Sequence, residues 1–210
     1  MDYPKEWDEL SRKERRKKIK ELKEQKREKK KQMGKIRNYA IGLLVVVVLI
    51  AGYAVATRKT PEQREREQQV QAVSLEGKVE EFDIEGREHV PSGTVVDYKT
   101  NPPTSGGHLA EAESWGVYDK EIDDKAAVHS LEHGGIWISY NDISDEEKAL
   151  LEELGRLNPG SVIISPRSEN DDTIVVASWG KMMRLESVDQ AVILKYIETY
   201  KNQSPEKLAK

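Results

Sequence analysis

The chain has 210 residues, of which 37% are hydrophobic, 34% are charged and none is cysteine. This length allows one domain with appended segments, or two small domains. The lack of cysteine excludes disulfide-stapled scaffolds and metal sites that use thiolate ligands. Residues 1–38 carry sixteen Lys or Arg against eight Asp or Glu, whereas the remainder carries 18 basic and 30 acidic residues. The chain is therefore a basic tail joined to an acidic body.

An apolar segment without a single charge, residues 39–56, follows the basic tail. As a helix it would be about 27 Å long, close to the thickness of the hydrocarbon core of a bilayer. Four consecutive valines and a tyrosine near each end disfavour a buried helix of a soluble protein. A signal peptide has a shorter apolar core and a shorter basic lead. We therefore predict an uncleaved transmembrane helix, with cleavage after Ala54 or Ala56 as the open alternative.

The distribution of basic residues predicts the orientation of this helix. Because Lys and Arg are enriched on the cytoplasmic side of membrane spans, residues 1–38 are expected to be a cytoplasmic tail. The protein is then a single-pass protein of the cell membrane, with residues 57–76 as a polar stalk and residues 77–210 as a domain outside. The tail is expected to be partly helical and to contact anionic lipids of the inner leaflet. No nucleic-acid partner is expected, since the tail lacks interleaved aromatic residues.

The fold expected for residues 77–210 is α+β, with a small mixed sheet and flanking helices. Alternating or continuous apolar runs predict strands at 78–84, 93–98, 136–140, 161–165 and 173–179. The last two of these are expected to form a hairpin through the polar turn 168–172. Helices are expected at 122–131, at 145–157 after the capping box of Ser144 and Glu147, and from Ser187 to about Tyr200. The segment from Ser204 onward is expected to be frayed.

Two short motifs concentrate the histidines of the chain. The first reads Asn101-Pro-Pro-Thr-Ser-Gly-Gly-His108 and the second Val128-His-Ser-Leu-Glu-His-Gly-Gly135. They contain His108, His129 and His133, and the fourth histidine, His89, lies upstream. Proline, glycine and serine favour tight, defined turns. Several histidines held on such turns indicate a binding site, and a metal site is the simplest interpretation.

The expected ligands are three histidines, with a fourth as a candidate. His129 and His133 are four residues apart and therefore share one face of a helix. With His108, and with His89 as the candidate fourth ligand, they could bind Zn²⁺ or Cu²⁺. Glu132 is expected to be a ligand, to orient a histidine, or to face solvent. If no metal is bound, no other cofactor is indicated.

The loop before His108 is expected to form one wall of this site. Its prolines fix φ and its glycines allow conformations that other residues avoid. The alternative is a rigid groove that binds a peptide or another ligand without catalysis. A purely structural role for the histidines, as caps of turns, also remains open. The loop residues concerned are Asn101, Pro102, Pro103, Thr104, Ser105 and Gly106.

An enzymatic role is the third interpretation. The sequence His129-Ser-Leu-Glu-His133 matches H-x-x-E-H, in which two histidines bind zinc and the glutamate acts as general base. Such peptidases need a further carboxylate ligand and a large cleft, which this small domain does not clearly supply. Ser105 lacks the strand–turn–helix context of a nucleophilic serine. Whether the protein is an enzyme, and which residues would be catalytic, therefore stays undecided at this stage.

Two methionines bear on the identity of the metal. A thioether from Met182 or Met183 would favour copper. The alternative is that both methionines pack in the core after the last strand. Trp115, Trp137 and Trp179 are likewise expected in the core.

The combination of Tyr98, the motif 101–108, Gly116-Val-Tyr118 and the motif 128–135 resembles a bacterial family of short, membrane-anchored proteins, the domain-of-unknown-function family 3105. The resemblance covers roughly residue 77 to the end, and Ala177-Ser-Trp179, Met182, Met183 and the last helix also match it. Gly107 departs from the family pattern, in which proline is more common. The resemblance implies a related fold and a location outside the cytoplasm. It implies no activity.

Overall fold

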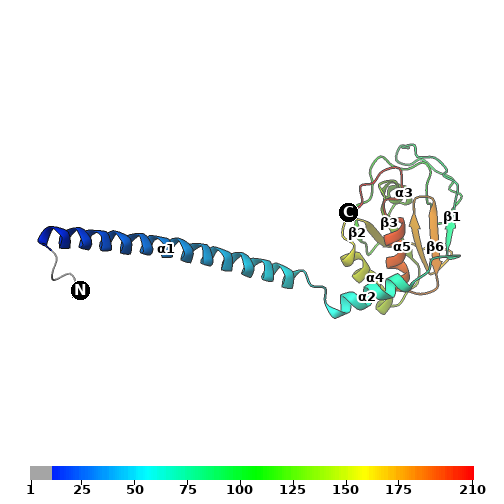
Figure 1. Cartoon of the computed structure of the whole chain (residues 1–210). Helices are drawn as coiled ribbons and strands as arrows, with labels where there is room; N and C mark the ends of the chain where they lie inside the picture. The colour runs from blue at the N-terminus through cyan, green and yellow to red at the C-terminus, as the bar shows by residue number, and fades with distance from the viewer. Residues whose placement is uncertain (1–10) are drawn as a thin grey trace. The chain divides into compact units, whose positions relative to one another are not determined.

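The computed structural model describes residues 11–210 in two compact units, one that ends at Thr60 and one that spans Pro61–Lys210. The first unit consists of one continuous helix, α1 (Arg12–Ala56), shown in blue in Figure 1. Ser11 caps its first turn, and the side chain of Glu14 reaches back to the backbone of Ser11, which completes a capping box. The first ten residues of the expected tail lie outside the described residues.

The apolar segment 39–56 forms the carboxyl-terminal part of α1. Within the described residues, α1 alone is long and apolar enough to cross a membrane, with a mean hydropathy of 2.2 over 18 residues, none of them buried. Length and composition are the whole basis of this assignment, and a signal sequence near the amino terminus meets the same criteria. The chain therefore carries one candidate membrane helix.

The second unit is built on a mixed sheet of six strands in the order β1-β6-β5-β3-β4-β2. Helices flank the sheet, so the predicted α+β class is confirmed. The strands are β1 (Val79–Glu81), β2 (Gly116–Val117), β3 (Ile136–Tyr140), β4 (Val162–Pro166), β5 (Ile174–Ser178) and β6 (Lys181–Leu185). The helices are α2 (Pro61–Ala72), α3 (Asp124–Glu132), α4 (Asp145–Leu157) and α5 (Gln190–Tyr200).

Strand β3 occupies the middle of the sheet. It pairs in parallel with β4 and antiparallel with β5, and β5 pairs antiparallel with β6. The predicted hairpin of 161–165 with 173–179 is therefore wrong, because β3 lies between these two strands. The reason is that the continuous apolar run of β3 is buried and takes a neighbour at each edge. The true hairpin partner of β5 is β6, reached through a turn in which Gly180 has a φ of +68°.

The alternation of side chains along β3 divides the core between the two faces of the sheet. Ile136 and Ile138 pack with the apolar residues of α4 and α5. Trp137 points to the other face, where it packs with Ala127, Val128 and Leu131 of α3. Helix α3, which carries the second histidine motif, is thus held against the sheet by its own apolar side.

Two local predictions are corrected by the structure. The segment 93–98 is not a strand, although its valines favour one, because no strand of the sheet pairs with it. The last helix begins two residues later than expected. Its cap is Asp189 instead of Ser187, and the carboxylate of Asp189 accepts hydrogen bonds from the amides of Ala191 and Val192.

The carboxyl-terminal segment is not frayed as expected. Backbone amides of Glu206, Leu208 and Ala209 donate hydrogen bonds to the carbonyls of Glu132 and His133, at 2.9–3.1 Å. Residues 201–210, here called the carboxyl-terminal strap, therefore satisfy carbonyl groups that the end of α3 leaves open. Gly134 is required beside the strap, since a Cβ atom there would lie 2.4 Å from Oδ1 of Asn202.

Helix α2 belongs to the same compact unit as the sheet. Val70 is buried, and Arg66 forms an ion pair with Glu153 of α4. The expected stalk, residues 57–76, thus includes a helix that contacts the domain.

Candidate metal centre

An isolated parallel bridge between two chain segments places His89 beside His108. The amide of Val90 donates to the carbonyl of His108 at 2.8 Å, and the amide of His108 donates to the carbonyl of Glu88 at 3.0 Å. Residues paired in this way point their side chains to the same side. The two imidazole rings accordingly lie with their centroids 5.1 Å apart.

Helix α3 brings two further groups to the same place. His129 and Glu132 are three residues apart and thus share one face of this helix. The ring of His129 lies 4.9 Å from that of His89 and 4.8 Å from that of His108, measured between centroids. One ligand atom from each of His89, His108, His129 and Glu132 can be chosen so that all four lie within 4.8 Å of one another. These four residues are called the histidine group below.

Backbone carbonyls fix the tautomers of two of the three histidines. Nδ1 of His108 lies 2.8 Å from the carbonyl oxygen of Gly106, and Nδ1 of His129 lies 2.7 Å from that of Leu109. A carbonyl oxygen can only accept a hydrogen bond, so both Nδ1 atoms must carry the proton. In the neutral rings, each Nε2 atom is then left with a free lone pair. Metal-binding histidines are oriented in this way by their surroundings.

The Nε2 atom of His108 lacks a hydrogen-bond partner. It is buried, and within residues 11–210 no group meets the geometric requirements of a hydrogen bond to it. Oε2 of Glu132 is nonetheless only 3.1 Å away. With His108 neutral and Glu132 ionised, this contact brings two electron-rich acceptors together, which is unfavourable. A proton or a metal ion between the two groups would remove the repulsion.

The burial of the group is uneven. His108, His129 and Glu132 are buried, whereas His89 is exposed. Arg87 stands at the same opening, with Nε 3.9 Å from Oε1 of Glu132 and 65% of its side chain exposed. Burial lowers the pKa of His129 below its usual value, and the neighbouring His133 and His108 lower this pKa further. The neutral, metal-binding form of His129 is therefore favoured at neutral pH.

The structure does not bring His133 into the histidine group. His133 is the residue that ends α3, and its Nε2 atom lies 3.1 Å from Oε2 of Glu206 in the carboxyl-terminal strap. Its ring still contacts that of His129, with 4.4 Å between centroids. The H-x-x-E-H interpretation requires both histidines on one ion, whereas Nε2 of His133 contacts Glu206 in this structure. The shared face is instead formed by His129 and Glu132.

The buried loop 101–106 supports the histidine group next to His108. Pro102, Pro103, Thr104, Ser105 and Gly106 are all buried. The hydroxyl group of Ser105 accepts a hydrogen bond from the amide of Glu85, and the hydroxyl of Tyr98 donates to the carbonyl of Gly107. A Cβ atom at Gly106, whose φ is +116°, would lie 3.1 Å from the ring of Tyr98. The loop therefore holds His108 from one side through backbone contacts.

Asn101 anchors the same loop to a buried arginine. Its Oδ1 atom accepts a hydrogen bond of 2.5 Å from Arg167. Arg167 also forms a two-pronged ion pair with Asp124, at 3.0 and 2.8 Å, and donates to Asn170. We call these four residues the arginine network. Asp124 is in the first turn of α3, so the network connects both motifs that carry the histidines.

The arginine network was missed by sequence reasoning. Neither Arg167 nor Asp124 stands in a recognisable motif, and the two are 43 positions apart. The signal that could have found it is Asn101, a polar residue before two prolines that has no obvious local partner.

Met182 and Met183 are both fully buried and lie in the core clusters on opposite faces of the sheet. This is the core packing that the sequence analysis left open as the alternative to a thioether ligand. Trp137 and Trp179 are also in the core, and the ring of Trp179 packs edge-on against His108 at 6.3 Å between centroids.

The histidine group has donor atoms of a type and spacing that suit a transition metal ion. An ion with bonds of about 2.1 Å in a tetrahedral arrangement separates its donor atoms by roughly 3.4 Å. Donor atoms within 4.8 Å of one another can reach this spacing through small side-chain rotations. The histidine group offers a buried lone pair without a partner, two histidines of fixed tautomer and a buried carboxylate as donors.

A comparison with known proteins identifies the family. No curated protein and no solved structure was found to match the chain. The sequence model of one family matches residues 89–210, which include the histidine group, the arginine network and the sheet except β1. Since this match spans more than half of the chain, the protein belongs to the family described as "Protein of unknown function (DUF3105)".

Proposed function

We propose that this protein binds a transition metal ion, Zn²⁺ or Cu²⁺, through His89, His108, His129 and Glu132. The single observation that carries the proposal is the buried Nε2 atom of His108, which has no hydrogen-bond partner among the described residues and lies 3.1 Å from a carboxylate oxygen. Burying an unsatisfied polar group costs about 1–3 kcal/mol. A bound cation accounts for this arrangement, because it would use the lone pair and the carboxylate together.

The donor set narrows the choice of metal. Imidazole nitrogen and carboxylate oxygen suit Zn²⁺ and Cu²⁺, whereas monovalent copper prefers soft thiolates and thioethers. The chain has no cysteine, and both methionines of β6 are enclosed in the core. The metal would be held by buried groups on three sides and by the exposed His89 on the fourth, which leaves it reachable from solvent.

The site belongs, in this proposal, to a domain outside the cytoplasm. The support is the candidate membrane helix, together with the sixteen basic residues that precede residue 39. The basic tail would then lie against anionic lipids of the inner leaflet. A domain so placed would handle a metal ion at the outer surface of the membrane.

The proposal is tested on the full-length protein, purified in detergent without a histidine tag. Metal content is measured by mass spectrometry after incubation with Zn²⁺ or Cu²⁺ and removal of the excess. The Glu132→Gln variant removes the charged ligand at nearly constant size, and His133→Ala is the matched control on the same helix, outside the group. We expect near-stoichiometric metal in the wild type and in His133→Ala, and a strong loss in Glu132→Gln.

Two outcomes would contradict the proposal. One is a folded wild-type protein that binds neither metal above background. The other is equal loss of metal in Glu132→Gln and His133→Ala, which would point to unspecific binding by surface histidines. If no metal binds, the rigid groove for a peptide or another ligand becomes the better interpretation of the two motifs.

A further inference from the structure

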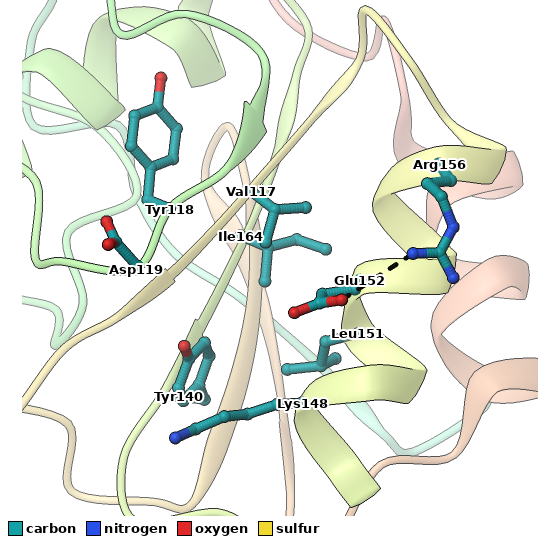
Figure 2. A pocket seen from close by; sticks show the side chains of 9 residues that line it. All are labelled: Val117, Tyr118, Asp119, Tyr140, Lys148, Leu151, Glu152, Arg156 and Ile164. Atoms are coloured by element: carbon teal, nitrogen blue, oxygen red, sulfur yellow. Dashed lines mark ion pairs between the residues drawn. The ribbon is translucent and has the colours of Figure 1, made fainter. Parts of the chain in front are cut away.

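Two surfaces lie outside the proposed metal site, a cavity of the domain and one side of the amino-terminal part of α1. The cavity has a volume of about 450 Å³ and lies between α4 and β2 (Figure 2). Its lining carries Lys148 and Arg156 against Asp119 and Glu152, so its charges balance and select no ligand by sign. The amino-terminal part of α1 differs, because basic residues gather on one side of it.

The apolar residues of this part of α1 follow a heptad repeat. Residues 12–38 contain four large apolar side chains, Ile19, Leu22, Met33 and Ile36. In the repeat abcdefg with Ile19 at a, they occupy only a and d positions, which form one seam along a helix. Because α1 is helical throughout, the four side chains lie on one side, here called the tail seam. Met33 and Ile36 are 66% and 62% exposed, so their apolar surface is open to a partner.

Charge is distributed unevenly around the tail seam. The four acids of residues 12–38 all occupy c or f positions, on the opposite side of the helix: Glu14, Glu21, Glu24 and Glu28. The e positions beside the seam are all basic: Arg16, Lys23, Lys30 and Arg37. The seam is therefore an apolar stripe with a basic border.

A second copy of the chain is a poor partner for the tail seam. Lys26 and Lys29 occupy the a and d positions between the two apolar pairs. When two such helices pair in register, parallel or antiparallel, these lysines meet lysines of the other copy. The e and g positions add to the repulsion in a parallel pair, where Lys18 faces Lys23 of the other copy. A partner with acidic residues at these positions would turn each repulsion into an attraction.

A membrane would cover only the end of the tail seam. Helix α1 continues without interruption from the tail into the apolar segment 39–56 (Figure 1). With a rise of 1.5 Å per residue, Leu22 lies about 25 Å along the axis from residue 39. The potential of an anionic leaflet falls off over roughly 8 Å at physiological ionic strength. The lipid contact proposed above is thus made by residues close to the span, and Ile19 and Leu22 remain for a protein.

We infer that the tail seam binds an acidic helix of a partner protein in a two-stranded coiled coil. Apolar side chains of the partner cover the seam, and its carboxylates lie opposite Lys26, Lys29 and the basic e positions. Charge complementarity carries the inference, because charges at e and g decide which helices pair. The inference uses the proposed membrane span to place the tail and is independent of the metal.

The test uses a synthetic helix of three heptads as the probe. It has leucine at a and d of the first and last heptads, glutamate at a and d of the middle heptad, and glutamate at all e and g positions. A control probe has lysine in place of each glutamate. Fluorescence anisotropy measures the binding of either labelled probe to the full-length protein in phosphatidylcholine nanodiscs. We expect a dissociation constant of about 10 μM for the acidic probe and binding at least about 100-fold weaker for the basic one.

Variants separate the tail seam from unspecific attraction between opposite charges. Leu22→Ala should weaken binding of the acidic probe about tenfold, because it removes apolar area from the seam. Lys23→Glu, at an e position, should weaken it about fivefold. The matched control is Lys17→Glu at an f position, the same charge change on the opposite side, which should alter the affinity less than about twofold. Circular dichroism checks that all variants keep their helix.

Four outcomes would overturn the inference. The acidic probe fails to bind, or the basic probe binds equally well. Equal weakening by Lys23→Glu and Lys17→Glu would show attraction of net charge alone. Loss of acidic-probe binding in nanodiscs with about 30% phosphatidylserine would show that the seam lies on the bilayer, whereas we expect an affinity within about threefold of that in phosphatidylcholine.

Discussion

Arg167 and His108 are both buried polar residues of one domain, and both connect the loop before residue 108 to other elements. Arg167 donates hydrogen bonds to Asp124, Asn101 and Asn170, so its guanidinium group is well satisfied by the protein itself. His108 is satisfied only at Nδ1, while its Nε2 atom faces a carboxylate without a hydrogen bond. Buried polar groups normally find partners. The difference teaches that the arginine network is complete as folded, whereas the histidine group leaves a buried nitrogen atom without a hydrogen-bond partner among the described residues.

The largest expected change in stability comes from a substitution in the arginine network. Arg167→Met should lower the free energy of unfolding by about 3 kcal/mol, because it leaves the carboxylate of Asp124 without its buried partner. Urea unfolding followed by circular dichroism measures this change. A loss below about 1 kcal/mol would contradict the view that the network holds the two motifs together.

The next largest effect is expected for His89, the exposed member of the histidine group. His89→Ala should weaken metal binding by roughly 10- to 100-fold, as loss of one coordinating or orienting group commonly does. Because His89 is exposed, the free energy of unfolding of the metal-free protein should change by less than about 0.5 kcal/mol. Titration calorimetry and urea unfolding measure the two quantities. Unchanged metal affinity would remove His89 from the ligand set.

One carboxylate-to-amide substitution in each of the two sites should change the free energy of unfolding in opposite directions. Asp124→Asn should destabilise the metal-free protein by about 1–2 kcal/mol, since it weakens a charge-assisted pair. Glu132→Gln should stabilise it by up to about 1 kcal/mol, because the new amide can donate a hydrogen bond to Nε2 of His108. Urea unfolding in the presence of a chelator measures both. A loss of stability in Glu132→Gln would mean that the carboxylate is already satisfied.

The smallest effect concerns Glu147, which lies in the first turn of α4. Hydrogen bonds from the backbone amides of Ser144 and Val188 hold the pKa of Glu147 below its usual value of 4.5. The lowered pKa contributes stability above pH 4.5, which is lost as the pH falls through the pKa of the folded protein. The stability difference between wild type and Glu147→Gln should therefore shrink on acidification. Urea midpoints measured at about pH 6 and about pH 3.5 test this; a constant difference would contradict it.

Much of the fold was readable from local sequence. Strand β3 and helix α4 have the predicted bounds, because a continuous apolar run and a capping box are local signals. The order of the strands was not readable in this way. The pairing of β5 with β6 and the position of β3 between β4 and β5 depend on which edges are covered in the folded sheet.

The candidate site was predicted in its composition but not in its geometry. The clustering of His108 and His129 follows from their motifs, and Glu132 was left open between three roles. The separation of His133 from the group depends on Glu206, which is 73 positions away and gave no signal in the sequence. The orphaned Nε2 atom of His108 likewise results from a bridge between chain segments that no pattern within either segment specifies.

The carboxyl-terminal strap makes the stability of α3 depend on a segment that is distant in sequence. Helix α3 has nine residues, too few to be stable on its own, and its last carbonyls are capped by amides of residues 206, 208 and 209. Local detachment of the strap would leave these carbonyls without partners and would loosen the helix that positions His129 and Glu132. Amide hydrogen exchange in α3 therefore reports on the attachment of the strap.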